Sequence, residues 1–209
     1  FSAALIWLAL ISFHGAALAE PVPSPKVVFV IVDGIPADVI ERVPTPAIDA
    51  IAEAGGYSRA AMGGPIGEFA ETPTISAPGY MSLITGTWAN KHNVYKNYGI
   101  SPDYSYWNLF RLARSERPEL RLGIFSTWTD NRTILLGEGL AEGGNWRFDV
   151  VVDGLEKREA RLPPERMDVR IADIDDAVSR EAARLIESEG PDLSWVYLQH
   201  TDDVAHKHG

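Results

Sequence analysis

The chain contains no cysteine, and this absence removes a whole group of chemistries. Disulfide bonds, thiolate metal sites and a cysteine nucleophile are all excluded. A transition-metal site in this protein must therefore be built from histidine, aspartate or glutamate side chains.

Basic residues are scarce relative to acidic ones. Lys and Arg together number 19 against 29 Asp and Glu, which gives a formal net charge of −10, and the acidic residues are spread along the chain. Such a surface repels phosphate backbones, so we expect neither a nucleic-acid polymer nor anionic lipid as a partner. A small phosphate ester would need a local cation to offset this field.

Long hydrophobic runs are also lacking. The longest apolar run, in residues 1–19, extends over about a dozen residues, which is too short to span a bilayer. It ends in "ALA" before Glu20, as signal peptides do before their cleavage site, although a charged start is missing and Phe1 takes the place of Met. We predict a signal peptide, truncated at its start, over 1–19 and a proline-rich spacer over 20–25. The protein is then exported, periplasmic or extracellular, with no stable membrane anchor; a membrane anchor or a buried helix is the alternative.

Residues 26–209 are enough for one sizeable core and too few for two comfortable domains. The run "KVVFVIVDG", Lys26 to Gly34, is β-branched without alternation, which predicts a central strand buried on both faces. "TPAIDAIAEAGG" predicts a helix with Thr45 as its cap, Pro46 at its first position and Gly55 at its end. The apolar face of that helix comprises Ile48, Ile51 and Ala52.

The rest of the chain continues the alternation of strands and helices. Further helices are predicted in "SYWNLFRLARS" and "IADIDDAVSREAARLIESEG", and further strands in "RLGIFST", "FDVVVDG" and "LSWVYLQ". This alternation predicts an α/β sandwich with a mostly parallel central sheet flanked by helices. The sequence leaves the oligomeric state open.

Hydroxyl side chains precede an apolar helix in "TPTISAPGYMSLITG". Pro78 disfavours the α conformation at Ala77, so we expect the helix to begin at Pro78 and to end at Gly86. Ser76 then lies just outside a helix N-terminus, where partial positive charge favours an alkoxide or a phosphate oxygen. Simple helix capping by Ser and Thr is the alternative for this segment.

Acidic residues follow two of the predicted strands. Asp33 comes directly after "VVFVIV", at the carboxyl end of a strand, where open α/β sheets place their sites, although Asp-Gly alone is a turn signal. After "LSWVYLQ" the chain reads "HTDDVAHKHG", in which three residues separate Asp202 from His206. A carboxylate and an imidazole at neighbouring strand ends suit zinc, whereas a lone Asp-x-x-x-His pair is commonly a solvated loop.

In this order, the segments resemble the alkaline phosphatase superfamily and, within it, the type I phosphodiesterase/nucleotide pyrophosphatase family. The order is a strand ending in Asp-Gly, a hydroxyl before Pro in a helix ending in "TG", His and Asn in "NKHNVYKN", and a strand followed by Asp-x-x-x-His. The resemblance implies an alkaline-phosphatase-like fold and hydrolysis of small phosphate esters with two zinc ions. It implies that Ser76 is the nucleophile, that Asp33 and Ser76 bind one zinc, and that Asp202 and His206 bind the other.

The hydroxyl-rich segment also departs from the family pattern. The family places its nucleophile two residues before the proline, which selects Ser76 over Thr74. Members close to nucleotide pyrophosphatases usually carry Thr at that position and Asn after the proline, where this chain has Gly79. The substrate therefore stays open, with Gly79 and Trp128 as candidates for contacts to it.

Two other residues, His92 and Asn97, match family positions near the site, and we interpret both as structural. In the family, a later Asp-His pair and a further His complete the two metal sites, and neither occurs before Gly209. We therefore expect residues 26–209 to be the N-terminal part of a catalytic domain, incomplete at its C-terminus and inactive alone. The alternatives are a phosphotransferase or phosphomutase on the same core, or a non-catalytic exported binding protein.

Overall fold

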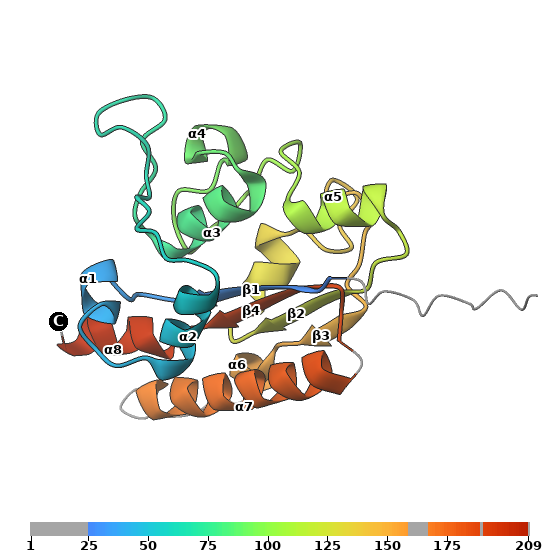
Figure 1. Ribbon diagram of the computed structural model, residues 1–209. Coiled ribbons are helices and arrows are strands. Elements are labelled where there is room, and N and C mark those ends of the chain that lie inside the picture. The colour runs from blue at the N-terminus through green and yellow to red at the C-terminus, as the bar shows by residue number, and fades with distance from the viewer. Residues whose placement is uncertain (1–24, 159–166, 189, 209) are drawn as a thin grey trace, which may run out of the picture.

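The computed structural model describes residues 25–158, 167–188 and 190–208, so the predicted signal peptide lies outside the described part of the chain. Its centre is one parallel sheet in the order β1-β4-β2-β3 (Figure 1). The strands are β1 (Val27–Val32), β2 (Leu122–Ser126), β3 (Val150–Val152) and β4 (Leu193–Leu198). The prediction of an α/β fold with a parallel central sheet is confirmed.

Helices cover both faces of the sheet, with α3 and α5 on one side and α7 on the other (Figure 1). The helices are α1 (Ala37–Ile40), α2 (Pro46–Ala54), α3 (Ser76–Thr85), α4 (Ala89–His92), α5 (Leu109–Glu116), α6 (Leu155–Arg158), α7 (Met167–Ser188) and α8 (His200–His208), with a π-helical turn, η1 (Asn131–Leu135). No helix in the described ranges is both long enough and apolar enough to cross a membrane.

The alternating side chains of β4 divide the core into two layers. Trp195 and Tyr197 are buried with residues of α3 and α5, while Val196 is buried with residues of α7. Because both faces of this strand are covered, its sequence is a continuous hydrophobic run rather than an alternating one. β4 is one of the two interior strands of the described sheet, paired with β1 on one side and β2 on the other.

The prediction that Lys26 to Gly34 is a central strand buried on both faces was wrong for the described chain. β1 pairs only with β4 there, and Val28 and Val30 are exposed. Its other face does join the core, through Phe29 and Ile31. The physical reason is the position of α7, which packs on β2, β3 and β4. The face of β1 that carries Val28 and Val30 is therefore left uncovered among the described residues.

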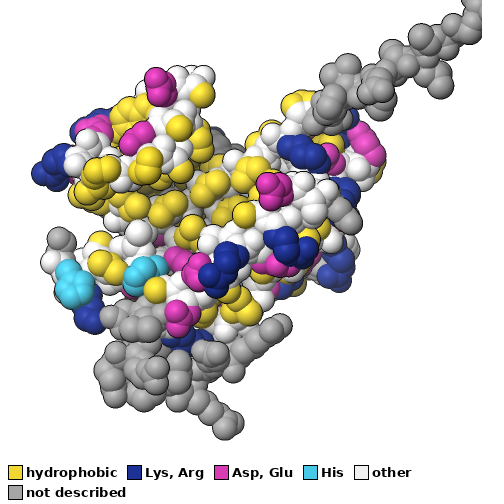
Figure 2. Space-filling model, turned by 60° about the horizontal axis from the view of Figure 1, so that its bottom comes forward, with side chains coloured by type: hydrophobic (Ala, Val, Ile, Leu, Met, Phe, Trp, Pro, Cys, Tyr) yellow, Lys and Arg dark blue, Asp and Glu magenta, His cyan; other side chains and the backbone are white. Residues whose placement is uncertain are grey.

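The bounds of α2 agree with the prediction, from Thr45 as N-cap to Gly55 as C-cap. Its apolar face is nevertheless exposed, with Ile51 72% accessible and Ile48 43%. Figure 2 shows hydrophobic side chains gathered beside a band of charged ones on the face it brings forward. Hydrophobic periodicity thus identified the helix without showing what, if anything, covers it.

The start of α3 differs from the prediction by two residues. Ile75 is the N-cap, and the N–H of Gly79 donates to its carbonyl over 2.9 Å, so the helix begins at Ser76. Pro78 is then in the first turn, where a missing N–H breaks no intrahelical bond. Burial of Ala77 and Pro78 outweighs the preference of a pre-proline residue for extended backbone. The helix does end at Gly86, which is left-handed with φ 65°.

Candidate active site

The carboxyl ends of the parallel strands meet at one edge of the sheet, and a cavity of about 240 Å³ opens there. The residues that line it are Asp33, Ser76, Asn97, Trp128, Tyr197, Gln199 and Asp202. Four of the candidate catalytic, metal and substrate-binding residues, distant along the chain, thus share one cavity: Asp33, Ser76, Trp128 and Asp202. Each comes from a strand end or from a helix that starts at this edge.

Asp33 continues β1, and its backbone N–H donates to the carbonyl of Leu198 over 3.0 Å. One carboxylate oxygen, Oδ1, accepts from the N–H of Gly34 over 3.0 Å. The other, Oδ2, accepts from the hydroxyl of Tyr197 over 3.1 Å and from that of Tyr80. Asp33 is thereby fixed at the cavity wall.

Tyr80 and Tyr197 are buried, and their hydroxyl oxygens are 3.1 Å apart. Burial, followed by the charge of Asp33, raises the pKa of Tyr80. Burial and then the neighbouring Tyr80 and Asp33 raise the pKa of Tyr197. Both phenols therefore stay protonated and act as hydrogen-bond donors to Asp33. Neither was singled out from the sequence, because a Tyr in a strand or helix is usually core.

Ser76 is the first residue of α3 and is partly exposed to the cavity. The next backbone N–H, that of Ala77, donates to Oδ1 of Asn97 over 2.8 Å. Asn97 thus bonds to the start of α3, and it also lines the cavity. This second property, which the sequence analysis missed, follows from the loop that returns Asn97 to the start of the helix.

The segment after β4 is a helix, α8, which the sequence analysis did not predict. In a helix, residues four apart lie on the same side, so the spacing of Asp202 and His206 brings them together. Nε2 of His206 is 3.5 Å from Oδ1 of Asp202, although the His206 side chain is 80% exposed and does not line the cavity.

Asp202 lies at the wall of the cavity, and Asp203 does not. Burial and then the charge of Asp33 raise the pKa of Asp202, so the two carboxylates act on one another electrostatically. Asp203 instead lies near the side-chain amide of Gln199, with Nε2 at 3.4 Å from each carboxylate oxygen.

Two other residues named from the sequence lie away from the cavity walls. Gly79 faces Met62, whose Cε would lie 3.6 Å from a Cβ at that position. His92 is fully buried, with Nε2 at 3.0 Å from Oγ of Ser82, and Nδ1 accepts from the N–H of Val94 over 3.2 Å. Burial lowers the pKa of His92 from 6.5 to about 4, so this ring is neutral.

A divalent cation fits the chemistry of the cavity. Two carboxylates and a hydroxyl line it, while no Lys or Arg does, so nothing among the lining residues balances the negative charge. Carboxylate and hydroxyl oxygens with a nearby imidazole are acceptable ligands for zinc. Within the described ranges, however, no three His, Asp or Glu side chains are close enough together to hold a metal ion.

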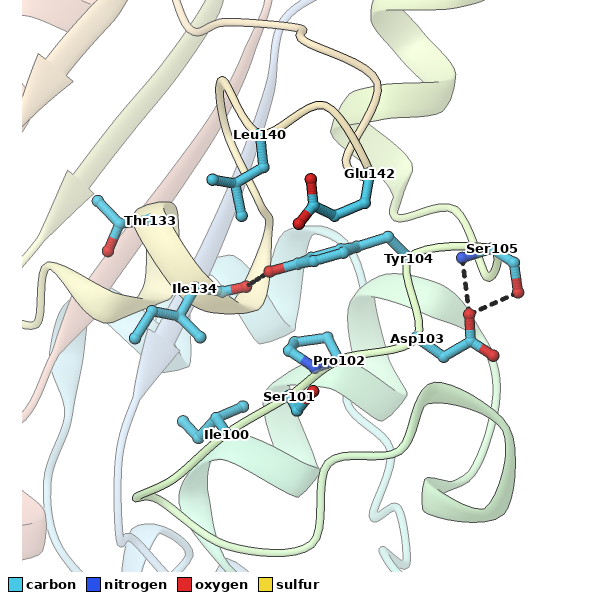
Figure 3. A pocket seen from close by; sticks show the side chains of 10 residues that line it. All are labelled: Ile100, Ser101, Pro102, Asp103, Tyr104, Ser105, Thr133, Ile134, Leu140 and Glu142. Carbon is cyan, nitrogen blue, oxygen red and sulfur yellow. Dashed lines mark hydrogen bonds between the residues drawn. The ribbon is translucent and has the colours of Figure 1, made fainter.

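A larger cavity lies elsewhere, with a volume of about 520 Å³ (Figure 3). Its wall includes the ring of Tyr104 and the carboxylates of Asp103 and Glu142. The hydroxyl of Tyr104 bonds to the carbonyl of Ile134, and the Asp103 carboxylate accepts from the N–H and hydroxyl of Ser105. None of the residues that line the smaller cavity contributes to this one, so size alone does not locate the candidate site.

A parallel sheet flanked by helices, with a serine at a helix start between acidic strand ends, is consistent with the alkaline-phosphatase-like class of metal-dependent enzymes. Comparison with known protein families matches residues 27–209 to the type I phosphodiesterase / nucleotide pyrophosphatase family, and the chain belongs to it. At the level of the family, the activity is hydrolysis of phosphoric esters. Searches of curated proteins and of solved structures found no significant match.

Proposed function

We propose that this protein is a metal-dependent phosphodiesterase that uses Ser76 as its nucleophile and two zinc ions. The observation that carries the proposal is the single cavity lined by Ser76, Asp33 and Asp202. A neutral hydroxyl is a weak nucleophile and a phosphodiester is an anion, so both need positive charge close by. The residues that line the cavity include no Lys or Arg to provide this positive charge, but they include oxygen ligands that can bind a cation.

Asp33 and Ser76 would hold one cation, and Asp202 with His206 the other. When bound, such cations lower the pKa of a serine hydroxyl and offset negative charge on the phosphoryl group. Tyr80 and Tyr197 keep Oδ2 of Asp33 in hydrogen bonds, and this fixes the orientation of its carboxylate toward the cavity.

Ser76 forms and then loses a covalent bond to the phosphoryl group in the proposed reaction. Oγ of Ser76 gives up its proton and attacks phosphorus, so that a bond between them forms and the bond from phosphorus to the leaving alkoxide breaks; the alkoxide takes up a proton and leaves as the alcohol. Water then cleaves the serine ester and restores the hydroxyl. Partial positive charge at the start of α3 favours both the attacking alkoxide and the phosphoryl oxygens.

Asn97 is suited to contact a phosphoryl oxygen. Its Oδ1 already accepts from the N–H of Ala77, so its Nδ2–H groups are the donors that remain for a substrate. Trp128, which follows β2, provides an apolar wall for a substrate group.

We also propose a small phosphodiester as the substrate and an exported protein as its context. The first rests on the net charge of −10, which disfavours a polyanionic polymer, and the second on the signal-like run in residues 1–19.

Turnover of an aryl phosphodiester tests the proposal in the protein expressed from its complete reading frame. Release of the aryl alcohol should stop after chelation, return on addition of zinc, and be absent in Asp33→Ala. Hydrolysis that survives both chelation and Asp33→Ala would contradict the proposal. An added alcohol in the same assay distinguishes hydrolysis from transfer, since a transferase would yield its phosphate ester in place of the hydrolysed product.

A further inference from the structure

Asp175 lies in the middle of α7, outside the candidate site, and its carboxylate reaches the carboxyl ends of two strands. Oδ1 accepts from the backbone N–H of Gln199 over 3.1 Å and from the hydroxyl of Thr127. Oδ2 accepts from the backbone N–H of His200 over 2.7 Å. One side chain thus joins α7 to the residues that follow β2 and β4.

All three partners of this carboxylate are donors, which suits a group that only accepts. Gln199 and His200 are the residue before α8 and its first residue, whose N–H groups have no partner within the helix. A negative charge at that end also complements the helix dipole. Asp175, a residue of α7, therefore caps the N-terminus of α8.

The same turn of α8 is also bonded to the residue that follows β1. The hydroxyl of Thr201 donates to the backbone carbonyl of Asp33 over 2.5 Å. Asp175 of α7 and Asp33, which follows β1, thus form hydrogen bonds with two consecutive residues of α8, His200 and Thr201. The next residue is Asp202, which lines the cavity.

We propose that Asp175 is a positioning residue that fixes α8 so that Asp202 and His206 face the cation opposite Asp33. The inference rests on the proposed function, because α8 matters in this way only if those two residues are ligands. Asp175 is not among the residues that line the cavity, so it would act through α8 rather than as a ligand.

The test is the zinc dissociation constant of folded Asp175→Asn, measured by competition with a chromophoric chelator. Asn presents an amide N–H₂ in place of one oxygen, so it cannot accept from all three donors. We expect zinc affinity to fall about 10- to 100-fold, the usual cost of losing a group that orients a ligand.

Two matched variants separate positioning from stability. Asp176→Asn removes the adjacent acid of α7, which pairs with Arg180 over 2.5 Å at the surface, and should leave affinity unchanged. Thr127→Val removes one bond to Asp175 while leaving both bonds to α8, so it should destabilise the fold in urea without changing zinc affinity more than about twofold.

Each outcome decides the inference. If Asp175→Asn lowers stability but binds zinc as tightly as the unchanged protein, Asp175 is merely structural and the inference fails. If Asp175→Asn does not fold, Asp175→Glu, which keeps the charge but shifts the carboxylate by one methylene, must show the weaker zinc binding instead. Asp202→Ala is measured alongside: unchanged zinc binding in that variant would refute the proposed function itself.

Discussion

Gly34 and Asp202 approach so closely that a Cβ on Gly34 would lie 2.5 Å from Cα of Asp202. Gly34 also has φ +70°, in the left-handed region that favours glycine. The glycine after Asp33 therefore serves two purposes, since it turns the chain at the end of β1 and leaves room for the first turn of α8. The spacing of the two candidate metal-binding carboxylates depends on it.

Gly34→Ala should consequently damage both stability and metal binding. We expect it to cost more than the roughly 1 kcal/mol typical of left-handed strain, because α8 must also move away from the added methyl group. Gly86→Ala is the matched control, since Gly86 has φ +65° with nothing within 4 Å of the added atom. Urea unfolding and zinc titration of both variants check this; equal losses of stability, with zinc affinity retained in both, would show that the contact with Asp202 has no consequence.

The ligand on α8 should be Asp202 rather than its neighbour. Asp202 lies in the cavity with Asp33, whereas Asp203 lies beside Gln199. Metal analysis of the purified variants should show that Asp202→Ala loses zinc and that Asp203→Ala largely keeps it, with an affinity loss of about tenfold at most. The reverse order would exclude Asp202 as the ligand.

His92 should make stability depend on pH. Its pKa is lowered from 6.5 to about 4 by burial, so the unfolded chain binds a proton between these values that the folded chain does not. The contribution of the neutral His92 ring to the free energy of unfolding is fully present above pH 6.5 and is lost as the pH falls toward 4. One pKa unit corresponds to about 1.4 kcal/mol, so the loss is on the order of 3 kcal/mol.

Urea unfolding of the unchanged protein and of His92→Gln, at several pH values from 7 to 4, measures this contribution. Gln keeps a hydrogen-bonding side chain beside Ser82 but does not titrate. The unchanged protein should lose stability relative to His92→Gln as the pH falls; parallel curves would show that His92 does not titrate abnormally.

Much of the fold was predictable because its signals are local. The hydrophobic run of β4 and the cap, proline and glycine of α2 identify these elements, and alternating strands and helices give a parallel sheet whose carboxyl ends meet. That geometry places Asp33 and the residues that follow β4 at one edge, while the choice of Asp202 among them came from the resemblance to the family.

Other features depend on contacts between distant segments. No local pattern shows that one face of β1 is uncovered in the described part of the chain, that Tyr80 and Tyr197 share an oxygen of Asp33, or that Asn97 returns to the start of α3. The start of α3 was misplaced for the same reason, because burial of Ala77 and Pro78 outweighs a local preference.

The central claim is that Ser76 carries the phosphoryl group during turnover. Removing the hydroxyl in Ser76→Ala should lower the hydrolysis of an aryl phosphodiester by several orders of magnitude, while Thr74→Ala should stay within about tenfold. The most direct measurement is to quench the reacting enzyme in acid, digest it and locate the phosphoryl adduct by mass spectrometry. The account predicts a phosphate ester on Ser76 that disappears in Ser76→Ala. An adduct on Thr74, or turnover that persists undiminished in Ser76→Ala, would contradict it.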